Sequence, residues 1–146
     1  MALFSSFNIC ASGMTAQRLR SDVIMQNLAN VSTTSTSNGR PYVRKTVVFT
    51  EKPSTSFDQV LMTTQGAVGN GVKVTKIVED KSTAMRMVYE PAHPDADENG
   101  YVMQPNVNTV TEMTNLIDAS RAYEANITAF TGSKQMAMKG LEINNA

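Results

Sequence analysis

The sequence predicts an α+β protein with long N- and C-terminal helices paired as a coiled-coil-like inner domain and a small β-rich or loop insert between them. Two observations support this class. Apolar residues recur with helical spacing at both ends of the 146-residue chain, and short runs of strand-forming residues fill the middle. We therefore expect a helical inner domain formed by residues 1–31 and 106–146, and an outer insert formed by residues 32–105.

The N-terminal segment, residues 3–30, is predicted to be a helix because no proline interrupts it and its apolar residues form stripes. On a wheel of 100° per residue, about a third of the circle holds Leu3, Phe4, Phe7, Cys10, Ala11, Met14, Met25, Leu28 and Ala29. A second, weaker stripe holds Ile9, Ala16, Leu19 and Val23. The helix should end near Asn30, because residues 31–39 are β-branched residues and turn formers.

The middle of the chain is predicted to contain three short strands that form one small sheet. The strand candidates are residues 42–50, residues 72–78 and residues 85–89, which are rich in Val, Ile, Tyr, Phe and Thr. Residues 52–70 carry Pro, Ser, Gln and Gly and are expected to form a loop.

The C-terminal segment, residues 107–143, gives the clearest helical pattern. The predicted heptad seam consists of residues 113, 116, 120, 123, 127, 130, 134, 137 and 141, of which seven of nine are apolar or aromatic. Asn108 or Thr109 can cap the start of this helix, and Thr109-x-x-Glu112 fits a capping box.

The two helices together carry more apolar surface than a two-helix pair can bury, which predicts assembly. A pair, parallel or antiparallel, hides one face of each helix, so the second N-terminal stripe needs another partner. The alternative is that the β insert covers this stripe. The residues expected at subunit interfaces or in helix packing are Phe7, Met14, Leu28, Met113, Leu116, Tyr123, Ile127, Phe130 and Leu141.

Composition argues against an enzyme or a nucleic-acid-binding protein. The 13 basic residues balance the 13 acidic ones, whereas phosphate binding needs a basic surface. Cys10 is the only cysteine and His93, between two prolines, is the only histidine, so we expect no catalytic site and no metal site of the Cys or His type. No glycine-rich phosphate loop or G-x-S-x-G motif occurs, and no cofactor or small-molecule substrate is expected.

Residues 95–100 match the first half of a calcium-binding loop, D-x-D-x-N-G. The twelfth position, where such a loop needs a bidentate Glu, is Asn106. Because Pro91 and Pro94 also prevent an entering helix, the segment is interpreted as an Asx-rich turn. A non-catalytic binding module, either weakly calcium-binding or an export adaptor, remains the alternative function.

The chain has no apolar run long enough for a transmembrane helix, since the longest has four residues, Met1–Phe4. Its start lacks the basic n-region of a cleavable signal peptide. If the protein leaves the cytoplasm, we expect it to use a route that does not need that signal.

Several motifs in both halves of the chain carry a family resemblance. They are Ser12-Gly-Met-Thr-Ala-Gln-Arg18, Asn27-Leu-Ala-Asn-Val-Ser-Thr33, Tyr89–Val102, Pro105-Asn-Val-Asn108, Glu112-Met113 and Ala119-Ser-Arg-Ala-Tyr-Glu-Ala-Asn126. Together they resemble the bacterial flagellar basal-body rod protein family, and in particular its proximal-rod members. The signature residues are Asn27, Leu28, Ala29, Asn30, Arg121, Tyr123 and Glu124.

The resemblance implies a structural, non-catalytic subunit that polymerises into the axial tube of the flagellum, transmits torque and encloses the export channel. It implies paired terminal helices inside and the insert outside. The implied partners are further copies of the chain, other rod subunits, the basal-body ring or adaptor at the rod base and the flagellar type III export apparatus. The implied location is the rod, where it crosses the periplasm or cell wall, reached without cleavage of a signal peptide.

Overall fold

The computed structural model describes residues 2–53 and 69–144, and for residues 2–4, 143 and 144 it describes the backbone only. Most of the predicted loop at 52–70, and the side chains of Leu3 and Phe4, lie outside this description. The elements, in chain order, are α1 (Ala2–Ala29), β1 (Lys45–Glu51), β2 (Val72–Glu79), β3 (Arg86–Tyr89), β4 (Tyr101–Gln104) and α3 (Thr109–Asn144). The predicted α+β class, with long terminal helices around a small strand insert, is confirmed.

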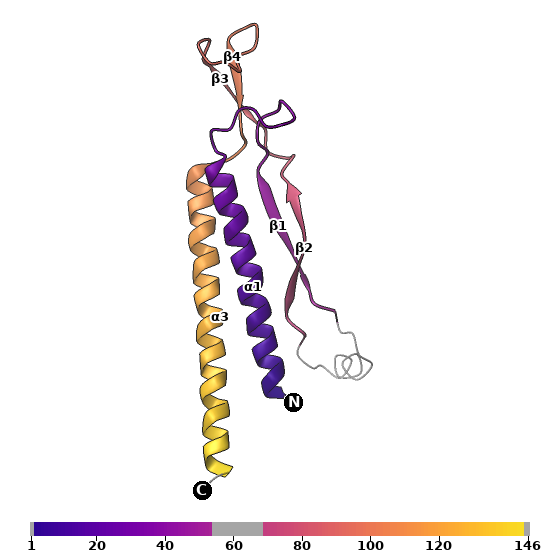
Figure 1. The fold of residues 1–146 in the computed structure, drawn as a ribbon, viewed down its shortest axis with the longest axis vertical. Coiled ribbons are helices and arrows are strands. Elements are labelled where there is room, and N and C mark those ends of the chain that lie inside the picture. The colour runs from indigo at the N-terminus through magenta and orange to yellow at the C-terminus, as the bar shows by residue number, and fades with distance from the viewer. Residues whose placement is uncertain (1, 54–68, 145–146) are drawn as a thin grey trace.

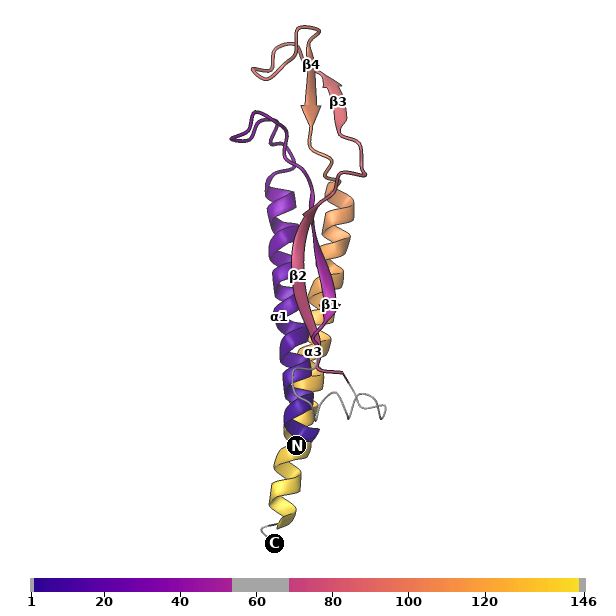
Figure 2. The same ribbon diagram turned by 90° about the vertical axis from the view of Figure 1, so that its right-hand side faces the viewer.

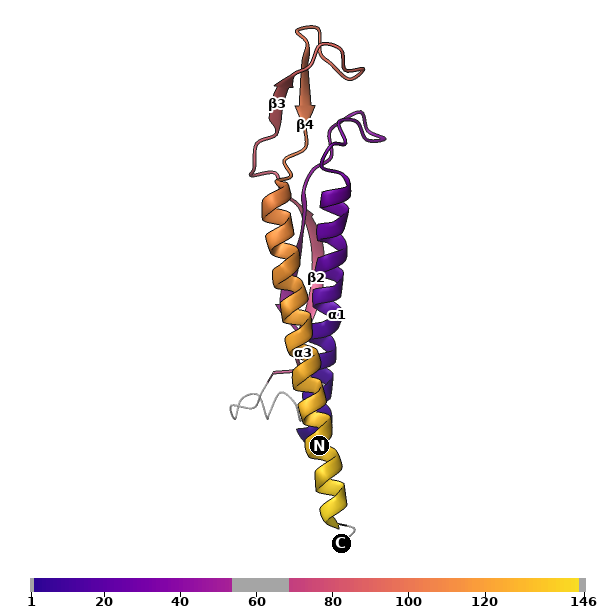
Figure 3. The same ribbon diagram turned by 90° about the vertical axis from the view of Figure 1, so that its left-hand side faces the viewer.

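Helices α1 and α3 lie side by side and run antiparallel, so that both chain ends lie at the same end of an elongated molecule (Figures 1 and 3). The α3 helix has 36 residues against 28 in α1 and continues past the start of α1. None of the helices in the described part of the chain is long and apolar enough to cross a membrane.

The seam between the helices follows a spacing of three and four residues along α3. The α3 residues that are buried or half-buried at this spacing are Glu112, Leu116, Ala119, Tyr123, Asn126, Phe130, Ser133 and Ala137. Every second position of the predicted seam is therefore one residue too late: the seam contains residues 112, 119, 126 and 133 in place of 113, 120, 127 and 134. Met113 and Ile127 lie outside the seam and are 54% and 41% exposed. Small and polar residues replace the expected large apolar ones because the helices approach closely: a Cβ added at Gly13 would lie 2.6 Å from Asn126 Oδ1.

Strands β1 and β2 form an antiparallel hairpin that packs along α1 on the side away from α3 (Figure 2). The backbone N–H of Val72 donates to Ser12 Oγ at 3.1 Å, which ties the start of β2 to the helix. Ala16 and Val23, from the second apolar stripe of α1, are only 3% and 5% exposed. The insert therefore covers this stripe, and the expectation that the stripe remains open for partners is wrong.

Strands β3 and β4 form a second antiparallel hairpin, which projects beyond the ends of the helices (Figure 1). The prediction of one sheet of three strands is wrong, since the described residues of the insert form two separate two-stranded sheets. The sequence had indicated a turn before Tyr101 but not the β4 strand that follows it.

Asparagine side chains cap the C-terminal end of α1 and the N-terminal end of α3. Asn30 closes α1, with Nδ2 donating to the Gln26 carbonyl at 2.8 Å. Asn108 caps α3, because its Oδ1 accepts from the backbone N–H groups of Val110 and Thr111 at 3.0 and 3.3 Å. The predicted capping box is wrong, because the Glu112 side chain points elsewhere, into a buried polar cluster.

Candidate functional site

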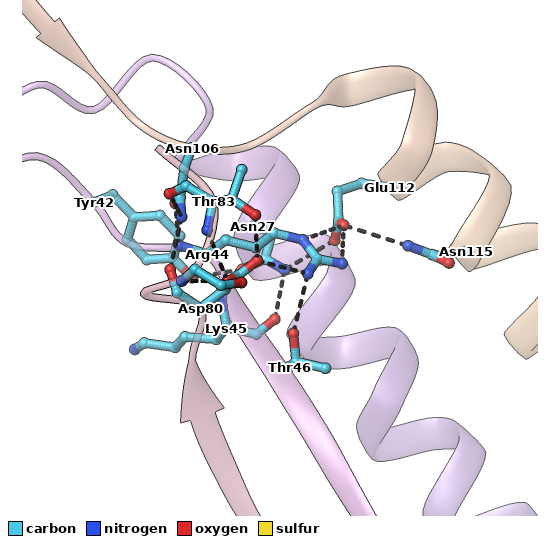
Figure 4. A network of polar contacts seen from close by, with 11 residues as sticks. Asn27, Tyr42, Arg44, Lys45, Thr46, Asp80, Thr83, Asn106, Glu112 and Asn115 are labelled. Carbon is cyan, nitrogen blue, oxygen red and sulfur yellow. Dashed lines mark hydrogen bonds and ion pairs between the residues drawn. The ribbon is translucent and has the colours of Figure 1, made fainter. Parts of the chain in front are cut away.

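A buried polar cluster, here called the junction, connects the end of α1, the start of α3 and the loops between the strands (Figure 4). Asn27 lies at its centre and is fully buried. Its Nδ2 donates to the Lys45 carbonyl and to Glu112 Oε2, both at 2.9 Å. Its Oδ1 accepts from the Tyr42 hydroxyl and from the Lys45 backbone N–H, again both at 2.9 Å. This one amide thus makes all four hydrogen bonds that its side chain can form.

Glu112 is the charged member of the junction and has no exposed surface. Arg44 Nε donates a hydrogen bond to Glu112 Oε1 at 2.8 Å, and Arg44 Nη2 forms an ion pair with the same oxygen, also at 2.8 Å. Burying an unpaired carboxylate costs free energy, and the Arg44 guanidinium and the Asn27 amide offset this cost for Glu112. The Arg44–Glu112 pair joins the residue before β1 directly to the first turn of α3.

Asn106 extends the junction to the loop after β2. Its Oδ1 accepts from the Arg44 backbone N–H at 2.8 Å, and its Nδ2 donates to the carbonyls of Asp80 and Thr83 at 2.8 and 3.2 Å. Hydrogen bonds from Ser82 and Thr83 hold the pKa of the Asp80 carboxyl well below its ordinary value. The junction therefore fixes five chain segments relative to one another through side chains that satisfy each other.

The environment of the junction raises the pKa of Tyr42. The side chain is buried, and burial raises the pKa of its phenol above the ordinary value of 10.0. The carboxylates of Glu112 and Glu79 raise the pKa further. Tyr42 therefore keeps its proton and donates it to Asn27.

The second feature is a row of exposed apolar side chains along α3, here called the α3 stripe. Its members are Val110, Met113, Ile117, Ile127, Met138 and Leu141, which are between 41% and 73% exposed. With the polar residues at 120, 124, 131 and 134, they form a second repeat of three- and four-residue steps, next to the seam with α1. The predicted seam combined residues of both repeats.

The residues predicted for packing or interfaces divide between the two repeats. Those in or beside the α1–α3 seam are half-buried: Phe7, Met14, Leu28, Leu116, Tyr123 and Phe130. The rings of Phe7 and Phe130 lie 5.0 Å apart between centroids. Met113, Ile127 and Leu141 lie on the α3 stripe instead.

The signature residues have different surroundings. Asn27 is in the junction, Asn30 ends α1, and Leu28 and Tyr123 are half-buried. Ala29, Arg121 and Glu124 are exposed, and Glu124 is one of the polar residues in the same repeat as the α3 stripe.

The sequence had not indicated the junction as a site. From the sequence, Tyr42 and Arg44 are expected only in a strand, and Glu112 only in a helix cap. The one available signal was that Asn27 and Glu112 both fall in the motifs that carry the family resemblance.

The segment that resembles half of a calcium loop forms the turn between β3 and β4. Asp95 Oδ2 accepts from the Thr34 hydroxyl at 2.7 Å, and Asp97 pairs through its backbone with Gly100 and Tyr101. Across residues 2–53 and 69–144, no three His, Cys, Asp or Glu side chains gather in a way that could hold a metal ion. Nothing in the described residues or in the comparisons below supports a calcium-binding or adaptor module.

A long antiparallel helix pair, fixed by a buried junction and bearing an exposed apolar stripe, defines a structural protein built to assemble. Comparison with known proteins shows the family to which the chain belongs. The family described as "Flagellar basal body rod FlgEFG protein C-terminal" matches residues 98–143. The flagellar basal-body rod protein FlgC of Bacillus subtilis is 48% identical over 98% of this chain and 99% of its own length.

Other relatives agree. FlgC of Borreliella burgdorferi is 45% identical over 98% of both chains. FlgC of Escherichia coli O6:H1 is 39% identical, also over 98% of both chains. The chain belongs to the FlgC family of flagellar basal-body rod proteins.

Proposed function

We propose that this chain is a structural subunit of the proximal rod of the bacterial flagellum, and that it assembles with further copies of itself and with other rod subunits. The observation that carries the proposal is the α3 stripe, whose six large apolar side chains are exposed in the single chain. A monomeric protein seldom leaves six large apolar side chains exposed along one side of a helix, so the stripe fits a surface covered by neighbouring helices in a polymer.

The remaining partners follow from the same role. As a rod subunit, the chain contacts the ring or adaptor at the rod base and is delivered by the flagellar type III export apparatus. It lies in the rod, where the rod crosses the periplasm or cell wall. Its helices form the inner part of the subunit and line the export channel, and residues 32–105 form the outer part. The work of the subunit is to transmit torque, and no catalytic step is assigned to it.

The α3 stripe can be tested without disturbing the fold. Leu116 and Phe130 lie in or beside the α1–α3 seam, so changing them would disturb the monomer as well as any interface. Ile117 is 54% exposed on the stripe and is the better position. We expect Ile117→Asp to leave the urea midpoint of the purified chain unchanged, while the variant is absent from isolated basal bodies and the cells build no hooks.

The matched control is Ala129→Asp, which places the same charge on an exposed position of α3 two residues after Ile127, and so on the side of the helix away from the stripe. This variant should enter basal bodies normally. Normal hooks in cells that produce only Ile117→Asp would contradict the role of the stripe, and absence of the wild-type chain from basal bodies would contradict the proposed function itself.

A further inference from the structure

One face of the β3–β4 hairpin, here called the tip face, is apolar and exposed. The register pairs Met87 with Met103 and Tyr89 with Tyr101, so these four side chains share a face. They are 59%, 38%, 63% and 41% exposed, in that order. The rings of Tyr89 and Tyr101 meet edge to face, with centroids 5.3 Å apart.

The other face of the same hairpin is covered within the chain. Val102 on that face is 1% exposed, and its cross-strand partner Val88 is half-buried. An isolated two-stranded ribbon is marginal in water, and an apolar face at the projecting end of a molecule is expected to have a partner. The tip face is therefore a second exposed apolar surface, separate from the α3 stripe.

The charge around the tip face is acidic. Residues 86–104 contain four acidic residues and one arginine, which gives the hairpin a formal charge of −3. Glu90, Asp97 and Glu98 are exposed next to the strands. An apolar centre with an acidic rim fits a partner that carries a few apolar side chains among basic ones.

The same chain carries such a surface on the β1–β2 hairpin, here called the hairpin outer face. The register pairs Thr50 with Lys73, Val48 with Lys76 and Thr46 with Val78, so one face carries both lysines and Val78. Val78 is 38% exposed, Lys73 and Lys76 are exposed, and this face has no acidic residue. The opposite face, with the half-buried Phe49 and Val74, packs toward α1.

The positions of the two faces allow them to meet in a stack. The tip face lies at one end of the molecule, and β1 and β2 extend from the helix junction toward the other end, where both termini lie (Figure 1). A second copy that is displaced along the long axis and overlaps the side of the first brings its tip beside the hairpin outer face of the first. Because the two surfaces differ, the contact is heterologous, and it generates an open helical assembly when the rotation between copies does not close a ring.

We propose that the tip face of one copy docks on the hairpin outer face of a second copy, with the acidic rim of the tip against Lys73 and Lys76. This inference rests on the proposed function, and it specifies which surfaces join successive copies. It is independent of the α3 stripe, because the two surfaces share no residue.

Charge reversal and rescue test the contact in cells that produce only the variant chain. Asp97→Lys with Glu98→Lys, or Lys73→Glu with Lys76→Glu, places like charges across the contact. We expect each double variant to lower the amount of chain in purified basal bodies by about tenfold, because repulsion replaces the attraction between the acidic rim and the two lysines. Combining the four substitutions should restore the wild-type amount, because the attraction is restored with the signs exchanged.

The matched control combines Asp97→Lys and Glu98→Lys with Lys81→Glu and Arg40→Glu, at exposed basic residues outside both the hairpin outer face and the α3 stripe. This control restores the net charge but not the contact, so it should remain defective. Circular dichroism of each purified variant should match the wild type, since all the altered side chains are exposed.

Three results would overturn the inference: normal incorporation of both double variants, failure of the fourfold variant to recover, or recovery of the net-charge control. In each case the wild-type chain would still be found in basal bodies if the proposed function holds. Absence of the wild-type chain would refute that function and is therefore distinguishable from failure of the docking contact.

Discussion

Asn27 near the end of α1 and Glu112 in the first turn of α3 are joined by a hydrogen bond of 2.9 Å between Nδ2 and Oε2, across 85 residues of sequence. Both side chains have no exposed surface. Since Arg44 binds the same carboxylate, the bond holds the two helix ends and the start of β1 at one point. The junction thus fixes the axial position of the two helices relative to each other at this end of the pair.

Removal of the Glu112 carboxylate should therefore be strongly destabilising. Glu112→Ala leaves the Arg44 guanidinium and the Asn27 amide without their partner, and we expect a loss of about 3 kcal/mol in the free energy of unfolding. Glu112→Gln keeps the side-chain volume and an oxygen for Asn27, so its loss should be smaller. Urea denaturation followed by circular dichroism measures both values.

The control for this change is Glu142→Ala, which removes an ion pair of 2.7 Å with Lys139 on the exposed surface of α3. An exposed pair of this kind contributes less than about 1 kcal/mol, so the unfolding midpoint should scarcely move. Equal effects of the two alanine substitutions would show that the junction does not stabilise the chain as described.

Because the helices approach closely at Gly13, the effect of Gly13→Ala on stability should change sign when the Asn126 side chain is removed. In the wild type, Gly13→Ala brings a Cβ to 2.6 Å from Asn126 Oδ1. Asn126 must then give up its bond of 2.7 Å to the Ala122 carbonyl, and we expect a loss of about 1 kcal/mol of stability. In an Asn126→Ala background, where the obstacle is gone, the same Gly13→Ala change should stabilise the chain by up to about 1 kcal/mol through helix propensity.

A double-mutant cycle by urea denaturation measures this coupling. If Gly13→Ala had the same effect with and without the Asn126 side chain, the helices would not meet at these residues.

The raised pKa of Tyr42 makes stability depend on alkaline pH. The folded state holds the phenolic proton more tightly than the unfolded state, whose pKa is near the ordinary value of 10.0. The stabilisation is therefore complete below pH 10 and is lost as the pH rises through and above that value. Thermal unfolding between pH 9 and pH 11 should show a steeper fall in the melting temperature for the wild type than for Tyr42→Phe.

Tyr42→Phe also loses the hydrogen bond to Asn27, so its stability at neutral pH should be lower throughout. The informative quantity is the slope with pH. Identical slopes for the two proteins would mean that Tyr42 ionises as readily in the folded chain as in the unfolded one.

The helices could be predicted from the sequence because stripes of apolar residues extend over many turns, and three of the four strands because they are rich in β-formers. The β4 strand was missed because its four residues follow directly on a turn rich in Asp, Asn and Gly. Its strand character comes from pairing with β3, which a local pattern does not contain.

The phase of the α3 seam could not be predicted, because two repeats with the same spacing lie next to each other on one helix. The large apolar side chains of Met113 and Ile127 suggested the seam, whereas Ala119 and Asn126 occupy it. Close helix approach favours small side chains at the contact, and the sequence does not show which surface will be approached.

The junction could not be predicted from the sequence either, but for a different reason. Its members come from five segments and are polar, and polar residues are by default assigned to the surface, to turns or to caps. Only the folded chain brings Asn27, Arg44 and Glu112 within hydrogen-bonding distance of each other.

The sandwiching of α1 between α3 and the β1–β2 hairpin has a kinetic consequence. Asn27 reaches across 18 residues to Lys45 but across 85 to Glu112. The entropy lost on closing a loop grows with its length, and contacts between distant residues form slowly. We expect the hairpin to cover its side of α1 early in folding. The opposite side of α1 should stay exposed to solvent until α3, the last quarter of the chain, packs against it.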